Sequence, residues 1–445
     1  MFYLYLIITV VHLLLQFMEI DSLQLLISYL SVATLLLAFK HTTSVYRWSG
    51  TVFLLLGLIM YISLSPKPDS FSLFGRMVFV LAFLFVLPFI NLIIRLGRYD
   101  QSLSRLIKSR AEDLLGVYRY SGIATFSLAM FLNIATVAVM YNTTYSMMGQ
   151  YGADKQQKLF AKVIMRSFAL GLVWSPLEPV LATTIDQTGS SYLSVFPILL
   201  LGSVLFILID WIIFKRSLSH LRLTKQADVI FRDIDKKRLL NFGSGVICII
   251  AVVLSADLLF ESNLITILTL LIPVLSSVWA LLLRKGQKFI GLARLTALKN
   301  TTKLHNYFFM FIAAGFFVEV VKATSLFSYL SLQLQWVYYH WPLGFFYLVI
   351  AAFILILAVC GFHPIIILTL VMPFLIPYTE IHPWGLSIVL SATLLASVPI
   401  SPYSVSQAVL ASLIQVNPYR ITLWNFRFVL GYVLFFVIIA AIVGF

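Results

Sequence analysis

Gly171-Leu-Val-Trp-Ser-Pro-Leu-Glu-Pro179 places two prolines, a serine and a glutamate in the middle of an otherwise apolar segment. A continuous membrane-spanning helix does not tolerate this composition, because each proline removes a backbone donor and clashes with the preceding turn. The polar groups freed by the break need protein, solute or water as partners. A second interruption, Val398-Pro-Ile-Ser-Pro-Tyr-Ser404, lies in a later apolar run. Two broken helices at matching positions of two halves indicate the binding site of a transporter.

The composition is that of a polytopic membrane protein. Of the 445 residues, 61% are hydrophobic and only 11% are charged, and the mean hydropathy of +0.99 excludes a soluble globular protein. Apolar runs of about 17 to 25 residues recur along the chain, each long enough to cross a hydrocarbon core of roughly 30 Å. The first run, from Phe2 to Phe17, lacks a basic flank and a small-residue cleavage site, so we expect a retained helix and not a signal peptide.

Basic residues cluster in a few segments and indicate the orientation of the chain. Of the 31 lysines and arginines, 28 lie in residues 40–47, 95–119, 151–166, 215–238, 284–303 and 420–427. The positive-inside rule predicts that these segments are cytoplasmic, and therefore that the N-terminus is cytoplasmic too. We expect a multi-pass protein of the inner (cytoplasmic) membrane, whose net charge of +14 faces anionic lipid head groups and no nucleic acid.

This topology predicts two hairpins and two broken helices. The stretch 99–119 is basic and amphipathic and is expected to lie along the inner membrane surface. The apolar segment that follows has basic segments on both sides, so we expect it to enter and leave on the cytoplasmic side as a re-entrant hairpin turning near Asn133. The predicted parts are N-terminal scaffold helices in 1–76, a first repeat in 77–214 (hairpin about 120–148, broken helix about 163–187), basic loops and linking helices in 215–304, and a second repeat in 305–445 (hairpin about 343–378, broken helix about 384–413).

The two halves correspond at a nearly constant offset. The paired landmarks are Asn91 with Glu319, Asn133 with His363, Ser175 with Ser401 and Gly202 with Gly431, which lie 228, 230, 226 and 229 residues apart. Because the first broken helix is expected to run outward and the second inward, the repeats are inverted. The sequence therefore predicts an all-α polytopic membrane protein with an inverted-repeat transporter fold.

The pattern resembles the ion transporter superfamily, most closely its divalent anion/sodium symporter-like proteins and related anion permeases, over roughly residues 77–445. In that family the first hairpin tip carries a Ser-Asn-Thr-Ala-Thr type motif. The matching stretch here, Leu132-Asn-Ile-Ala-Thr136, keeps Asn133 and Thr136 but lacks the leading serine and the middle threonine. The second tip, Gly361-Phe-His-Pro364, stands where the family often repeats the Asn-Thr motif. The resemblance implies an elevator-type symporter and a homodimer, with Na+, if it is used, near Asn133 and Ser175.

The broken helices supply most of the candidate site. Ser175, Ser401 and Ser404 are expected to bind solute, because half-helix N-termini attract anionic groups and carbonyl ends suit a cation; the alternative is a pair of proline kinks packed against neighbours. An ionised carboxylate near the membrane centre is costly, so Glu178 is expected to be protonated, paired or in water. Its predicted role is to carry a proton or bind the coupling cation, and the alternative is a structural ion pair.

The hairpin tips supply the remaining candidates. His363 could donate to an anionic solute or titrate near neutral pH, or it could simply cap a helix. Asn133 and Thr136 offer uncharged donors and acceptors to the solute, and Asn133 also to the ion. Glu319 and Lys322 are three residues apart and are expected to neutralise each other. Asp210, close to Lys215, is expected at the membrane interface.

We compared three classes of function. The favoured one is a secondary transporter that moves a small organic anion, expected to be a carboxylate, coupled to H+ or Na+ and without any other cofactor. The alternative is an exporter or flippase of an amphiphilic cell-envelope precursor on the same fold. An enzyme such as a polytopic glycan ligase or polymerase is disfavoured, because the predicted long loops are inward and no metal-binding or paired-carboxylate motif is present.

Overall fold

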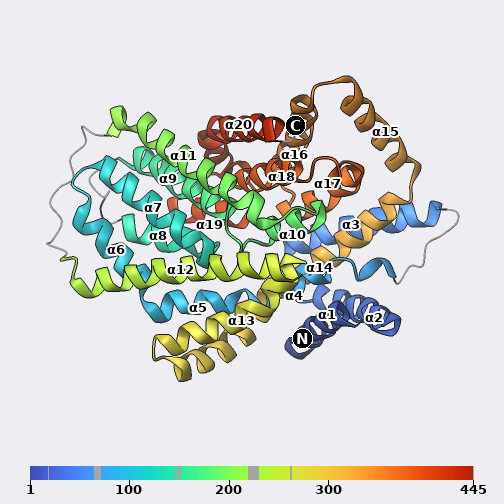
Figure 1. Cartoon of the computed structure of the whole chain (residues 1–445), viewed down its shortest axis with the longest axis horizontal. Coiled ribbons are helices and arrows are strands. Elements are labelled where there is room, and N and C mark those ends of the chain that lie inside the picture. The colour runs from blue at the N-terminus through green and yellow to red at the C-terminus, as the bar shows by residue number, and fades with distance from the viewer. Residues whose placement is uncertain are drawn as a thin grey trace. The chain divides into compact units, whose positions relative to one another are not determined.

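The computed structural model describes residues 1–18, 20–64, 72–145, 147, 152–218, 230–260 and 263–443. The elements of these residues are helical, as predicted from the sequence, and are labelled as in Figure 1. Nine helical segments of the described residues are long and apolar enough to cross a membrane by length and composition. The protein is therefore a multi-pass membrane protein. Residues 146 and 148 of the first predicted hairpin, 219–229 of a basic segment and 65–71 of the predicted scaffold lie outside the described residues.

The chain folds into two compact units. Unit 1 consists of Met1–Ile93, Ala256–Trp341 and Thr369–Pro377, and unit 2 of Ile94–Ser255, Pro342–Leu368 and Tyr378–Phe445. The elements of unit 1 are α1 (Phe2–Phe17), α2 (Asp21–Phe39), α3 (Ser44–Ser63), η1 (Ser72–Phe74), α4 (Val78–Val86), α13 (Leu264–Leu282), α14 (Gly286–Lys322) and α15 (Ser325–His340). Three helices, α5 (Pro88–Gly97), α12 (Asp233–Leu259) and α17 (Pro364–Thr379), contribute residues to both units.

Close packing of α3 on α14 organises unit 1. Gly50 and Gly57 are two turns apart on α3, and a Cβ added at either would come within 2.5 and 2.8 Å of the rings of Phe309 and Phe316. The absence of side chains at these glycines thus lets two aromatic rings of α14 approach the α3 backbone. On α14, Lys322 Nζ lies 3.0 Å from Glu319 Oε1, so the predicted neutralisation of this pair is confirmed.

One order of elements occurs twice, in unit 2 except for the middle of α17: two helices joined by a tight turn, an interrupted helix and a long helix. The first copy is α7 (Leu114–Leu132), α8 (Ala135–Tyr145), α9 (Ala153–Val173), α10 (Pro179–Thr188) and α11 (Tyr192–Leu218). The second copy is α16 (Leu343–Val359), α17, α18 (Pro383–Ala396) with η2 (Val398–Ile400), α19 (Val405–Ile414) and α20 (Pro418–Val443). Corresponding helices begin 226 to 230 residues apart, which is the offset of the sequence landmarks.

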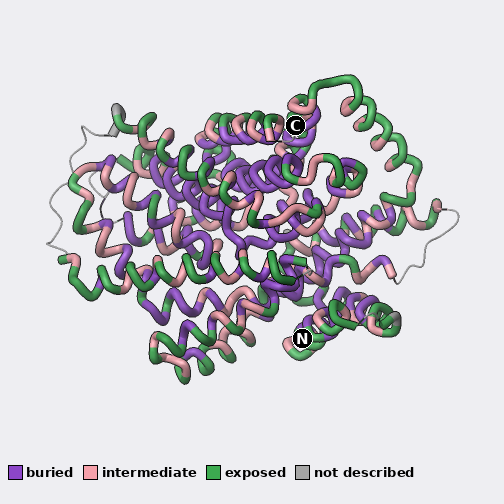
Figure 2. Tube along the Cα trace, viewed as in Figure 1, coloured by how far each residue is buried: buried purple, intermediate pink, exposed green. Residues whose placement is uncertain are grey.

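Both interrupted helices are enclosed by protein. Every residue of α18 from Gly385 to Ala396 is buried, as is every residue of α9 from Val163 to Val173 (Figure 2). A helix that is apolar and buried all round is surrounded by other helices and not by lipid. Accordingly, α18 packs against α9, α10, α16 and α20.

Some helix bounds differ from those expected. The surface stretch predicted over 99–119 is two elements, because α6 (Tyr99–Arg110) ends before Asp113, whose carboxylate accepts a hydrogen bond of 2.6 Å from Gly116 N and caps α7. The basic segments 151–166 and 284–303, expected as loops, lie largely within α9 and α14. Charge clusters mark where a chain leaves the hydrocarbon, and a helix can continue beyond that point.

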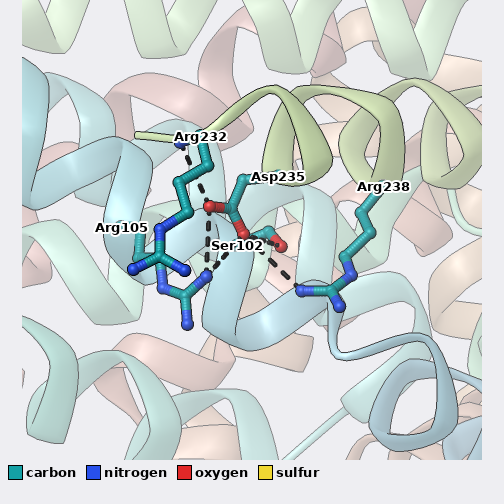
Figure 3. Close-up of polar contacts among 5 residues, drawn as sticks. All are labelled: Ser102, Arg105, Arg232, Asp235 and Arg238. Atoms are coloured by element: carbon teal, nitrogen blue, oxygen red, sulfur yellow. Dashed lines mark hydrogen bonds and ion pairs between the residues drawn. The ribbon is translucent and has the colours of Figure 1, made fainter. Parts of the chain in front are cut away.

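Asp235, near the start of α12, fastens this helix to α6 (Figure 3). Its fully buried carboxylate accepts hydrogen bonds of 2.9 Å from Ser102 Oγ and from Arg105 Nη1. The backbone N–H of Arg232 donates to it at 3.3 Å, and Arg238 Nη1 lies 3.6 Å away. Several donors around one carboxylate satisfy its lone pairs, so the contact fixes the end of α12 that belongs to unit 2.

Candidate functional site

The first broken helix is interrupted where the prolines predict. Helix α9 ends at Val173, and α10 begins at Pro179, a position where the missing backbone N–H is no loss. In the connection, Ser175 Oγ accepts a hydrogen bond of 3.2 Å from Leu177 N, and Ser175 O accepts one of 3.1 Å from Glu178 N. Ser175 is fully buried, so its hydroxyl shapes the turn from within.

The turn between α7 and α8 meets this break. Asn133 has a φ of 45° and a ψ of −130°, a conformation in which a side chain is strained and which glycine adopts more readily. Its backbone carbonyl accepts a hydrogen bond from Thr136 N at 2.9 Å. Its side-chain Nδ2 donates to Glu178 Oε2 at 3.2 Å. The two residues chosen from the sequence for ion coupling are thus in direct contact.

Glu178 is a buried carboxyl group whose surroundings are only partly polar. It is 6% exposed and stands at the N-terminus of α10, where the helix dipole favours negative charge. Within the described part of the chain it forms no salt bridge, and its coupling role stays a prediction. The Asn133 amide and the end of α10 therefore stabilise a charge that can also be neutralised by a proton or a cation.

Several buried polar atoms near the two breaks have no hydrogen-bond partner among the described residues. They are Thr136 Oγ1, Trp174 Nε1, Ser391 Oγ and Gln407 Oε1. Thr136 lies in the first turn of α8 and Trp174 within the first break, while Ser391 and Gln407 belong to α18 and α19. Buried polar groups are almost always satisfied in native proteins, so these atoms, like similar ones elsewhere in the described chain, are places where an ordered water can bind.

Hydrogen bonds of its two serines stabilise the second break. Ser404 Oγ accepts a hydrogen bond of 3.4 Å from Gln407 N as the cap of α19, and donates one of 3.3 Å to Val398 O. Ser401, 3% exposed, accepts a hydrogen bond of 3.0 Å from Ser404 N on its carbonyl. From α20, Thr422 Oγ1 donates to Ile400 O at 3.2 Å. The break predicted between α18 and α19 is therefore present and braced by α20.

The turn between α16 and α17 contacts the second break through Gly361. This glycine has a φ of 101°, and a Cβ added to it would lie 2.6 Å from Cδ2 of Tyr403. Tyr403, between the two serines, also shares a hydrogen bond of 2.6 Å with the hydroxyl of Tyr419. His363 caps α17, its Nδ1 accepting from Ile365 N at 3.4 Å, which agrees with the capping alternative. Its role in binding solute stays a prediction.

Gly361→Ala is expected to destabilise the protein by about 1–3 kcal/mol, because alanine is strained at this φ and its methyl group meets the Tyr403 ring. The measurement is the thermal unfolding midpoint of the full chain in detergent. Gly431→Ala is the matched control, since nothing lies within 4 Å of a Cβ at that helical position. Equal midpoints for the two variants would contradict the close contact between this turn and the second break.

The predicted site residues fall into two groups, both in unit 2. Asn133, Thr136, Ser175 and Glu178 surround the first break, and His363, Ser401 and Ser404 surround the second. Helix α9 packs against η2, and α18 packs against α9 and α10, so the broken helices contact each other. No direct hydrogen bond joins the first group to Ser401 or Ser404 in the described structure. A surface cavity of about 500 Å³ at the α13–α14 turn contains none of these residues.

Sequence reasoning missed a buried polar cluster in unit 2. Arg166 of α9 forms an ion pair with Asp210 of α11, which also accepts a hydrogen bond from the hydroxyl of Tyr118. Arg166 Nε donates to Asn425 Oδ1 of α20 at 3.0 Å, and its Nη2 donates to Trp424 O, also at 3.0 Å. The cluster joins four helices by contacts among buried side chains.

Asp210 is therefore paired inside the protein, and its expected position at the membrane interface stays a prediction. Asp210 is 5% exposed, and Arg166, which the charge count placed in a cytoplasmic segment, is 7% exposed. Both charges can be buried because each neutralises the other across two helices, a pairing that a count along the sequence does not show. The available signal was the position of both residues inside apolar stretches, Val163-Ile-Met-Arg-Ser-Phe168 and Phe206-Ile-Leu-Ile-Asp-Trp211.

The fold is similar to that of a known transporter structure. The crystal structure of the Alcanivorax borkumensis YdaH transporter, which has an unusual topology, superposes with a TM-score of 0.60. The likeness covers 89% of this chain and 97% of the YdaH chain at 10% sequence identity, so it shows the fold alone. No family model matches the sequence, and no curated protein matches it.

Proposed function

We propose that the protein is a secondary active transporter that moves a small organic anion, a carboxylate, across the cytoplasmic membrane with H+ or Na+. The observation that carries the proposal is the contact between Asn133 and Glu178, which joins a helix turn to a helix break at a buried carboxyl group. A buried carboxyl with an uncharged donor is suited to binding and releasing a cation or proton.

The repeated order of elements supports a transport mechanism based on two related halves. An inverted repeat with two re-entrant hairpins, as in the divalent anion/sodium symporter-like members of the ion transporter superfamily, places the two breaks on either side of one solute. In this proposal Ser175, Thr136, His363, Ser401 and Ser404 bind the anion, and Glu178 with Asn133 binds the coupling ion. The transport step is of the elevator type, in a homodimer with its N-terminus in the cytoplasm.

The proposal is tested by uptake into proteoliposomes that contain the purified full-length protein. A panel of radiolabelled mono- and dicarboxylates is offered with an inward Na+ gradient, with an inward proton gradient and with neither. We expect at least one carboxylate to accumulate only when a gradient is present. Absence of gradient-driven carboxylate uptake, together with movement of a fluorescent amphiphile between leaflets, would favour the flippase alternative and contradict the proposal.

A further inference from the structure

Two cations near one end of unit 2 have no acidic partner of their own. Arg119 of α7 and Lys162 of α9 form no ion pair within the part of the chain that is described, and Arg119 Nε is a buried donor without a hydrogen-bond partner. The buried carboxylate next to them, Asp210, is already bound by Arg166 and Tyr118. Since Arg166 neutralises Asp210, neither Arg119 nor Lys162 has a carboxylate of its own among the described residues.

The last turns of α11 provide an aromatic surface for these cations. Arg119 Cζ lies 5.8 Å from the centre of the Trp211 ring, and Lys162 Nζ lies 4.7 Å from the centre of the Phe214 ring. Trp211 and Phe214 are three residues apart, so they lie on neighbouring parts of one helix face. The two unpaired cations are therefore held beside adjacent rings by cation–π contacts and are not free in solvent.

An apolar strip on α11 borders Trp211, which follows Leu208 by three residues, whereas Phe214 lies farther round the helix. Leu201, Leu205, Leu208 and Ile212 follow one another at helical spacing and are 69%, 43%, 44% and 69% exposed. A soluble anion would use the cations alone. A lipid would use both features, with its phosphate at the cations and an acyl chain along the strip, and tryptophan is enriched at the membrane boundary where the two meet.

We infer that the end of α11, with Arg119 and Lys162, is a binding site for the head group of an anionic phospholipid. The phosphodiester supplies the negative charge that this region lacks, and the basic segments nearby place the site in the cytoplasmic leaflet. Basic pockets between membrane helices on the cytoplasmic side bind such head groups in general. The site does not depend on the identity of the transported solute.

The test is native mass spectrometry of the full-length protein with phosphatidylglycerol or phosphatidylcholine added in detergent. The wild type is expected to bind phosphatidylglycerol preferentially. The double variant Arg119→Gln/Lys162→Gln is expected to bind it about 30-fold more weakly, which corresponds to about 1 kcal/mol for each charge. Lys236→Gln/Lys237→Gln, which removes two exposed lysines of α12, is the matched control and should bind within twofold of the wild type.

Three results would overturn the inference: equal binding of both lipids, equal loss in the control variant, or thermal stabilisation by inorganic phosphate as large as that by phosphatidylglycerol. The third would identify a site for a soluble anion. If the double variant does not fold, the single variants Arg119→Gln and Lys162→Gln are each expected to bind about fivefold more weakly. Unchanged binding by both single variants would equally overturn the site.

Discussion

Replacement of Glu178 with glutamine is expected to reduce the coupling between solute and ion by about 100-fold, within the range found for linked binding sites. The contact with Asn133 can persist, because a glutamine amide oxygen also accepts a hydrogen bond. What the variant lacks is a carboxyl group that can bind a proton or a cation in a buried position. It should therefore fold and bind the solute, yet fail to concentrate it.

The measurement compares gradient-driven accumulation in proteoliposomes with solute counterflow in the absence of a gradient. In Glu178→Gln, accumulation should be lost while counterflow continues. Glu319→Gln is the matched control, since it removes a carboxylate that is paired with Lys322 in unit 1. Undiminished accumulation with an unchanged dependence on pH and Na+ would exclude Glu178 from coupling.

Removal of the Asp210 carboxylate has the largest effect expected on stability. Asp210→Ala should lower the free energy of unfolding by about 3–5 kcal/mol, because it leaves the buried guanidinium of Arg166 without its counter-charge. The hydroxyl of Tyr118 loses its acceptor in the same variant. Since Asn425 and Trp424 accept from Arg166 but carry no charge, they cannot compensate for the loss.

A second substitution separates the charge from the packing. In Arg166→Met/Asp210→Leu most of the lost stability should return, because apolar side chains of similar volume often replace a buried ion pair without net destabilisation. Asp154→Ala is the control for an exposed pair, with Arg420, and is expected to cost less than about 1 kcal/mol. Unfolding in detergent provides the comparison. An Asp210→Ala variant as stable as Asp154→Ala would show that the cluster contributes little to stability.

The breaks in the helices could be predicted because their causes are local. Each break contains a pair of prolines three residues apart, Pro176 with Pro179 and Pro399 with Pro402, which disrupt helical hydrogen bonding locally. Proline alone does not decide the outcome, since the structure also has prolines inside the continuous helices α11, α13 and α17. The turn at Asn133 followed from charge on both sides of one apolar segment, and the structure places a turn there. These features are properties of a few consecutive residues and of the charges that flank them.

The partners of buried polar groups could not be predicted, since they depend on which sides of the helices pack together. Arg166 and Asp210 are 44 residues apart, and no feature of the sequence indicates that they pair. The sequence likewise does not show that Asn133 contacts Glu178 and not another polar group. The capping role of His363 was one of two alternatives. It is seen only in the structure, where the backbone N–H of Ile365 donates to His363 Nδ1. Helix ends were also uncertain, because α9 and α14 continue through segments that are rich in lysine and arginine.

Helix α14 is longer than the hydrocarbon core of a membrane is thick. Its 37 residues extend about 55 Å at 1.5 Å per residue, whereas the hydrocarbon core is about 30 Å thick. Even at a tilt of about 40°, α14 spans about 42 Å along the membrane normal and exceeds the hydrocarbon core. Its basic first turns, which include Lys288, Arg294 and Lys299, must stand among head groups and water as a stalk. The turn that joins α13 to α14, next to these basic turns, is thereby placed outside the hydrocarbon.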